Sequence, residues 1–219
     1  MIDVKRRVAA PAGLAQRALR ARDVLEALHV DFLGKCYLCE SHVSPGGFEV
    51  DHRVQRSHDA SREYDWTNLF PICEGCNKRR RKKPPVGGLL DPASGEELIA
   101  HKLEQRIVDR HPHPPRPYFR SLDPANVAAR NTADELDHIH NDPNDPGAMK
   151  AKDLRDAVVY HQHRVFKICL QYLRSTGDEQ ARRELGEHLR ELLSRRAPYT
   201  ALTRAELAAM GPEIVALFD

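Results

Sequence analysis

The chain has 219 residues and a nearly balanced charge, with 34 Lys and Arg residues against 32 Asp and Glu residues. This length accommodates one moderate domain with an elaboration but excludes several large independent cores. Apolar residues make up 41% of the chain and aromatic residues only 6%, which favours a soluble, mainly helical protein over a β-sandwich. The net charge of +2 excludes a molecule-wide attraction for nucleic acid, so any such interaction must depend on a local cluster of cations.

No apolar stretch approaches the roughly 20 residues that a membrane-spanning helix requires. The first 28 residues are interrupted by arginines and lack the apolar segment of a secretory signal. The sequence therefore predicts a cytoplasmic protein that does not contact a membrane. In such a reducing compartment, the five cysteines require an explanation other than disulfide bonds.

Hydrophobic periodicity and composition divide the chain into four regions. An amphipathic pattern from Leu14 to Leu28 predicts a helix near the N-terminus, and a short β-like run follows at Phe48, Glu49 and Val50. The expected regions are an N-terminal helical lead-in at 1–30, a compact core at 31–85, a Pro-rich connection at 86–130 and a helical region at 131–219.

The C-terminal region contains two pairs of residues with the spacing of a helix-capping box. Thr132 and Glu135 predict a helix that begins at residues 131–133, and Thr203 and Glu206 predict the start of a last short helix. Two amphipathic helices are expected between these points, at Leu154–Tyr172 and Ala181–Leu193.

Four of the five cysteines form two Cys-x-x-Cys motifs, Cys36 with Cys39 and Cys73 with Cys76. A two-residue spacer lets both thiolates of a motif bind one metal ion, and four thiolates in tetrahedral geometry select zinc. A site with four protein ligands is structural rather than catalytic. The βαβ pattern of a thioredoxin-like redox motif is absent, and an iron–sulfur or redox role stays open as the alternative to zinc. Cys169 lies on an apolar helix face and is expected in the core.

Polar residues stand at fixed places around the two cysteine motifs. Asp51 and His52 follow the β-like run, Asn68 precedes the second motif, and Asn77 follows it directly. The order Cys-x-x-Cys, Asp-His, Asn-Leu, Cys-x-x-Cys-Asn-x-x-Arg resembles the HNH endonuclease family. The resemblance implies a small ββα-metal, treble-clef-like core stapled by zinc, within a mainly α protein. The sequence departs from the family in two ways, since Asn77 replaces a frequent histidine and no proline follows the Asp-His pair.

The residues surrounding the motifs are similar to the HNH nucleases of retron and Septu-type bacterial anti-phage systems. Three stretches carry this similarity, namely Leu28–Glu40, Tyr64–Leu69 and Leu90–Pro92. The similarity implies an effector of a defence system that works beside an ATPase.

The chemistry of phosphodiester hydrolysis fits these residue types. A neutral imidazole at His52 can take a proton from water near neutral pH, as a general base must. Asp51 and Asn77 offer oxygen ligands for one catalytic Mg²⁺ or Mn²⁺ ion, which would stabilise charge on the phosphate. By resemblance, Asn68 holds the connecting loop and orients His52. We therefore expect a metal-dependent endonuclease that cleaves DNA, and the resemblance to the family implies that it leaves a 5′ phosphate and a 3′ hydroxyl.

Six consecutive cations follow Asn77 and are candidates for nucleic-acid binding. If the helix that begins at the second cysteine motif continued through them, several would lie beside Asn77 and neutralise phosphates without reading sequence. An ordinary solvated charge run is the alternative. The six residues are Lys78, Arg79, Arg80, Arg81, Lys82 and Lys83.

Two other functions remain open on the sequence. The first is a non-catalytic zinc module that binds nucleic acid or a protein partner, which would have no need of a general base at His52. The second is an HNH-type RNase acting on transfer RNA. The residue types of the site do not distinguish the two polymers, because both present the same phosphodiester group to be hydrolysed.

Overall fold

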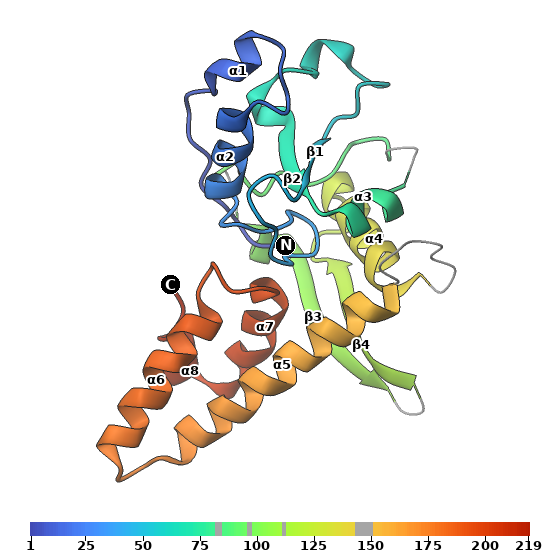
Figure 1. The fold of residues 1–219 in the computed structure, drawn as a ribbon. Coiled ribbons are helices and arrows are strands. Elements are labelled where there is room, and N and C mark those ends of the chain that lie inside the picture. The colour runs from blue at the N-terminus through green and yellow to red at the C-terminus, as the bar shows by residue number, and fades with distance from the viewer. Residues whose placement is uncertain (82–84, 96–97, 111–112, 143–150) are drawn as a thin grey trace.

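A computed structural model describes residues 1–219 except 82–84, 96–97, 111–112 and 143–150. Its described part is mainly helical and contains two separate two-stranded antiparallel sheets (Figure 1). The helices are α1 (Ala12–Ala15), α2 (Arg22–Asp31), α3 (Glu74–Arg79), α4 (Val127–Asn141), α5 (Ala151–Arg174), α6 (Glu179–Leu193), α7 (Thr200–Leu207) and α8 (Pro212–Val215). The strands are β1 (Glu49–His52), β2 (Leu69–Ile72), β3 (Leu103–Arg110) and β4 (His113–Ser121). Within the described ranges, no helix has both the length and the apolar character needed to cross a membrane.

The first sheet and the helix after it form the ββα unit predicted for residues 31–85. Strands β1 and β2 pair antiparallel, with Asp51 opposite Phe70 and His52 opposite Leu69. Every residue of β2 is buried, and α3 begins two residues beyond its end. Asp51 and His52 therefore lie at the end of a short strand whose partner is anchored in the core.

A half-buried arginine, Arg6, helps to fasten the N-terminal segment to this unit. The guanidinium of Arg6 lies over the rings of Phe32, Trp66 and Phe70 at 5.1, 5.0 and 4.6 Å from their centroids. It also donates hydrogen bonds to the carbonyl oxygens of Trp66 and Leu69. Burial lowers the pKa of Arg6 to about 10. The cation–π and hydrogen-bond contacts compensate for the cost of placing this cation among aromatic rings.

The predicted helix from Leu14 to Leu28 is in fact two helices, α1 and α2. The carboxylate of Asp23 accepts a hydrogen bond of 2.8 Å from the backbone N–H of Gly13, and Arg17 takes a left-handed conformation with φ of 57°. These features turn the chain between the helices. Hydrophobic periodicity does not predict this break, because the apolar spacing continues across it. The break depends instead on the side chain of Asp23, which accepts a backbone hydrogen bond.

Residues 86–130, expected as a Pro-rich connection, contain the β3–β4 hairpin. Pro114, Pro115 and Pro117 lie in β4, which pairs with β3 alone, and Pro117 stands opposite Ile107. An edge strand tolerates proline because one of its sides needs no backbone donors. The prolines thus exclude a helix here, as expected, but they do not exclude a strand.

The first predicted capping box is wrong, because α4 begins at Val127. Asn126 is the N-cap, and its side chain accepts from the backbone N–H of Ala129. Thr132 lies inside the helix, where its hydroxyl donates to the carbonyl of Ala128 and accepts from the N–H of Leu90. Thr132 therefore serves a tertiary contact rather than a helix end.

The second predicted capping box is also wrong, because α7 begins at Thr200. The Thr203 hydroxyl donates to the carbonyl of Tyr199, one turn earlier. The Glu206 carboxylate accepts a hydrogen bond of 2.6 Å from the backbone N–H of Ile107 in β3. Glu206 thus docks α7 on the hairpin.

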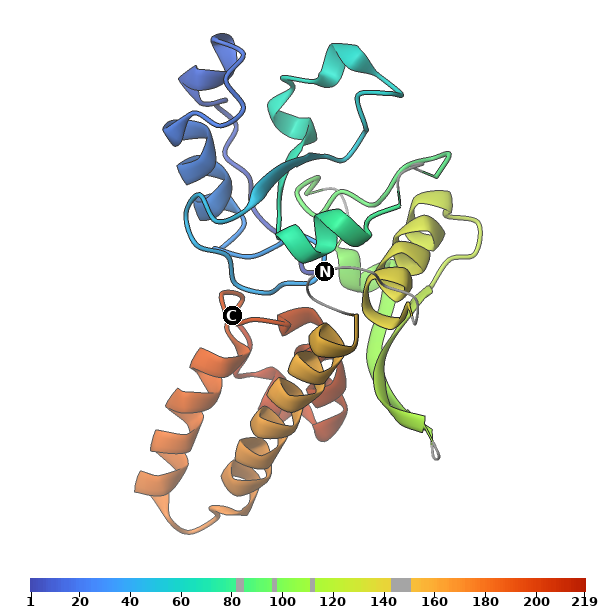
Figure 2. The ribbon, with the colours of Figure 1, turned by 45° about the vertical axis from the view of Figure 1, so that its right-hand side comes forward.

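Helices α5 and α6 pack side by side, and α7 and α8 complete a second hydrophobic core (Figures 1 and 2). The predicted stripes supply the buried residues of the first two helices, including Cys169. The core residues are Val165, Cys169, Leu189, Leu193, Leu207, Ile214 and Leu217. A buried lysine, Lys35, joins this part to the ββα unit. Its ammonium group forms an ion pair with Glu40 at 3.2 Å and also donates a hydrogen bond to the carbonyl of Ala197, which precedes α7.

Candidate functional site

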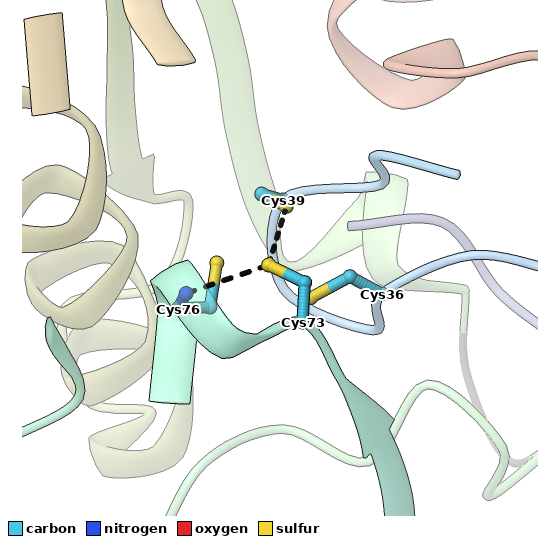
Figure 3. Close-up of side chains that lie close together, drawn as sticks. All are labelled: Cys36, Cys39, Cys73 and Cys76. Atoms are coloured by element: carbon cyan, nitrogen blue, oxygen red, sulfur yellow. Dashed lines mark hydrogen bonds between the residues drawn. The ribbon is translucent and has the colours of Figure 1, made fainter. Parts of the chain in front are cut away.

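The four predicted zinc ligands come together at the start of α3 (Figure 3). Cys36 and Cys39 lie in the loop after α2, Cys73 caps α3, and Cys76 lies in its first turn. Their sulfur atoms all lie within 4.8 Å of one another, and the Sγ atoms of Cys39 and Cys73 are 3.8 Å apart. Zinc–sulfur bonds of about 2.3 Å in a tetrahedron place the sulfurs about 3.8 Å apart. The cluster therefore fits a structural zinc ion.

The cysteine cluster favours one thiolate, at Cys73, whereas burial raises the pKa of Cys36 and the neighbouring sulfurs raise the pKa of Cys76. The neighbouring sulfurs of Cys36, Cys39 and Cys76 form hydrogen bonds with Cys73 Sγ and lower the pKa of Cys73. The backbone N–H of Cys76 also donates to this sulfur. Metal binding replaces the shared protons, so the same arrangement that stabilises one thiolate in the free protein prepares four ligands for zinc.

A polar cavity of about 440 Å³ lies beside the cysteine cluster and is lined by five of the predicted site residues, three of them the expected catalytic groups. Asp51 and His52 reach it from the end of β1, and Asn77 reaches it from α3. The rest of its lining consists of Gln55, Arg56, Ser57, Arg80 and Arg81. The structure thus brings a potential base, two potential oxygen ligands for a metal and cationic groups to one opening.

His52 has a defined ring orientation in this cavity. Its Nε2 atom lies 2.9 Å from the carbonyl oxygen of Glu63. Because a carbonyl oxygen only accepts hydrogen bonds, Nε2 carries the hydrogen of the neutral ring and Nδ1 keeps its lone pair. This is the tautomer in which Nδ1 can take a proton from water.

Asp51 is held by two donors on the same oxygen atom. The hydroxyl of Tyr37 donates a hydrogen bond of 2.6 Å to Asp51 Oδ2, and the guanidinium of Arg80 forms an ion pair with that oxygen. Arg80 also donates to the carbonyl oxygens of His52 and Arg53. Both side-chain contacts fall on Oδ2, so Oδ1 is the oxygen left for a metal ion.

Asn77 contacts a carboxylate that the sequence did not single out. Its Nδ2 atom donates a hydrogen bond to the side chain of Glu49, at the start of β1. Since a carboxylate only accepts, this contact directs the Asn77 amide nitrogen toward Glu49 and leaves its carbonyl oxygen for another partner. Alternation along a strand could have identified Glu49, because it precedes Asp51 by two residues and so lies on the same face.

Asn68 does not line the cavity, yet it holds the loop between β1 and β2. Its side chain is fully buried, accepts from the N–H of Val54 at 2.7 Å and donates to the carbonyl of Val54 at 2.9 Å. A further hydrogen bond of 3.1 Å runs to the carbonyl of Arg62, next to Glu63. Asn68 therefore supports the segment whose carbonyl orients His52.

The six cations after Asn77 do not form one exposed helical cluster. Helix α3 ends at Arg79, so the expected continuation does not occur. Arg79 is buried, and Arg80 is buried against Asp51. Lys78 is exposed and pairs with Glu74 one turn earlier. Lys82 and Lys83 lie outside the described residues.

Among the described cations of this run, Arg81 combines exposure with a place at the cavity. Its guanidinium donates to the carbonyl of Asp134 and lies 3.8 Å from Glu135. Arg80 and Arg81 both line the cavity. The buried part of the run thus stabilises the site, while Arg81 is placed to meet an anion there.

A larger cavity of about 650 Å³ lies apart from these residues, between the N-terminus, β3, α7 and the C-terminus. Its lining is mainly apolar, and it contains none of the residues of the cysteine cluster or of the cavity at His52. Volume alone therefore does not identify the chemical site of this protein, whereas the convergence of polar groups does.

The fold and the cavity define a ββα unit with a four-cysteine cluster and with a histidine, a carboxylate and an amide at one opening. Residues 36–83 match the family model of the HNH endonucleases. This segment begins at the first cysteine of the cluster and contains all eight residues that line the cavity. The match indicates a nuclease-type function that involves nucleic acid. Comparisons with curated proteins and with solved structures gave no significant match.

Proposed function

We propose that this protein is a metal-dependent endonuclease in which His52 is the general base and Asp51 and Asn77 hold one Mg²⁺ or Mn²⁺ ion. The observation that carries this proposal is the shared cavity of these three residues beside the cysteine cluster. The hydrogen bond from His52 to Glu63 and the free lone pair at Nδ1 support the role as base.

The chemistry follows from the residues that line the cavity. His52 Nδ1 takes a proton from a water molecule, whose oxygen attacks the phosphorus atom. The bond between phosphorus and the 3′ oxygen breaks, and this oxygen takes a proton from solvent water, which leaves a 5′ phosphate and a 3′ hydroxyl. A bound divalent ion would supply positive charge to the phosphate oxygens and to the leaving oxygen. Arg81 is placed at the rim of the same cavity, where it can hold the backbone of the substrate.

We propose DNA as the substrate. We also propose that the protein works in the cytoplasm, in a bacterial anti-phage system with an ATPase partner. This part rests on the sequence similarity to retron and Septu-type nucleases. An RNase activity on transfer RNA and a binding module without catalysis are the alternatives that the test must separate.

The test uses zinc-loaded protein with supercoiled plasmid, linear duplex DNA and structured RNA, each with Mg²⁺, with Mn²⁺ or with no added divalent ion. We expect cleavage of DNA that depends on the added ion and falls about 10²- to 10⁴-fold in His52→Ala, as loss of a general base predicts. His58→Ala is the matched control, since this histidine is exposed in the same loop and does not line the cavity. It should cleave like the unchanged protein.

Three results would change the conclusion. Cleavage of RNA alone would favour the RNase. Cleavage that persists in His52→Ala would exclude His52 as the base. Nucleic-acid binding without cleavage, at full zinc content and with equal binding by His52→Ala, would favour the binding module.

A further inference from the structure

Tyr37 connects the cysteine cluster to the cavity. It lies between Cys36 and Cys39 in the first motif, and it is only 4% exposed. Its hydroxyl donates to Asp51 Oδ2 over 2.6 Å, while its backbone N–H donates to the carbonyl of Pro71 in β2. One residue of the zinc-binding motif thus contacts both strands of the ββα unit.

The position of the Tyr37 ring is fixed from two sides. Zinc binding by Cys36 and Cys39 would hold its backbone, because both neighbouring ligands are then tied to one ion. The ring packs against Phe70 with centroids 5.0 Å apart, and Phe70 stands opposite Asp51 in the sheet. Its hydroxyl therefore meets Asp51 at a place set by the zinc motif and the core, not by the loop of the cavity.

We propose that Tyr37 is a positioning residue that couples the structural zinc site to the catalytic metal site by fixing the rotation of the Asp51 carboxylate. This inference rests on the proposed function, in which Asp51 binds the catalytic ion. Because Tyr37 holds Oδ2, the Asp51 side chain already has the rotamer in which Oδ1 faces the ion, and no rotamer freedom is lost when the ion binds. Loss of such an outer hydrogen bond to a ligand typically costs 10- to 100-fold in metal affinity or activity.

Arg80 contacts the same oxygen but has a different effect on metal binding. As a cation it repels a divalent ion on the same carboxylate, and its guanidinium also lines the cavity. The Tyr37 hydroxyl is neutral and orients the carboxylate without this repulsion. Tyr37 is therefore the contact that favours metal binding.

The test compares Mn²⁺ affinity in Tyr37→Phe and in the unchanged protein, measured by the electron paramagnetic resonance signal of free Mn²⁺ with zinc-loaded samples. Phenylalanine keeps the ring and its packing and removes only the hydroxyl. We expect the Mn²⁺ dissociation constant to rise 10- to 100-fold, with unchanged zinc content. Cleavage should recover toward the normal rate as Mn²⁺ is raised, since the defect lies in metal binding.

Tyr199→Phe is the matched control. The Tyr199 hydroxyl lies 3.3 Å from Ser41 Oγ, next to the cysteine cluster, and has no contact with Asp51 among the described hydrogen bonds. It should leave Mn²⁺ affinity unchanged. An unchanged affinity in Tyr37→Phe, or a loss of zinc together with Mn²⁺, would overturn the coupling through this hydroxyl.

Asp51→Ala separates failure of this inference from failure of the proposed function. If the protein binds Mn²⁺, Asp51→Ala abolishes that site and Tyr37→Phe does not weaken it, only the inference about Tyr37 is wrong. If no Mn²⁺ site depends on Asp51, the proposed catalytic metal site fails and the inference falls with it.

Discussion

Asn68 holds the loop that orients His52, and its replacement by alanine should weaken both the fold and the activity. The side chain makes three hydrogen bonds to the backbone of Val54 and Arg62, and it is fully buried. At a net value of about 1 kcal/mol for each bond, Asn68→Ala should lower the free energy of unfolding by about 3 kcal/mol. Buried backbone groups left without partners would add to this loss.

The effect on activity follows from the position of Glu63. Its carbonyl accepts from His52 and lies one residue beyond Arg62, which Asn68 holds. A displacement of a catalytic group by about 1 Å can lower a rate about 100-fold. We therefore expect Asn68→Ala to cleave about 100-fold more slowly, at a temperature where circular dichroism shows that the variant is folded.

Asn131→Ala provides the control for losing a bridging asparagine elsewhere. The Asn131 amide donates to the carbonyls of Val86 and Gly88 and does not contact the β1–β2 loop. Urea unfolding should show a smaller loss of stability, with a normal cleavage rate. If Asn68→Ala were as stable as the unchanged protein, or cleaved at the normal rate once folded, Asn68 would not be the residue that holds the loop at His52.

Two further predictions concern charge. Arg80→Gln should bind Mn²⁺ about tenfold more tightly, because the guanidinium paired with the Asp51 carboxylate repels a divalent ion that binds there. A Mn²⁺ titration of both proteins measures these affinities. Equal affinities would mean that the Arg80 guanidinium moves away from Asp51 at no free-energy cost when Mn²⁺ binds. The second concerns His140, which is buried on α4, where desolvation lowers its pKa to about 4. Since the unfolded chain takes up this proton at about pH 6.5, stability should fall as the pH drops from 6.5 to 4, by about 2 kcal/mol between pH 7 and pH 5. Urea unfolding at both pH values should show that His140→Leu loses about 2 kcal/mol less, whereas parallel losses would exclude His140 as the source.

The zinc ligands are the part of the site that the sequence predicts most completely. Two Cys-x-x-Cys motifs define the four ligands because the spacing itself permits both sulfurs of a pair to face one ion. Asp51, His52 and Asn77 were also identified from their order around these motifs, and the structure brings them to one cavity. Their catalytic roles remain proposals.

The partners of these residues were not predictable in the same way. Tyr37 reaches Asp51 only because the first cysteine motif folds against β2, and Arg80 reaches it only because α3 ends one residue earlier. Glu135 accepts from Arg81, although 54 residues separate them. Such contacts depend on how distant elements pack, and no local pattern encodes them.

Spacing and periodicity along the chain were enough to predict the cysteine cluster, the place of the polar residues around it and the helical character of the C-terminal region. The split of the N-terminal helix, the β3–β4 hairpin and the burial of Arg79 and Arg80 became evident only in the folded structure. A run of cations predicts exposed side chains, because burying a charge costs its hydration. Arg80 is buried nonetheless, since its ion pair with the buried carboxylate of Asp51 compensates for the lost hydration.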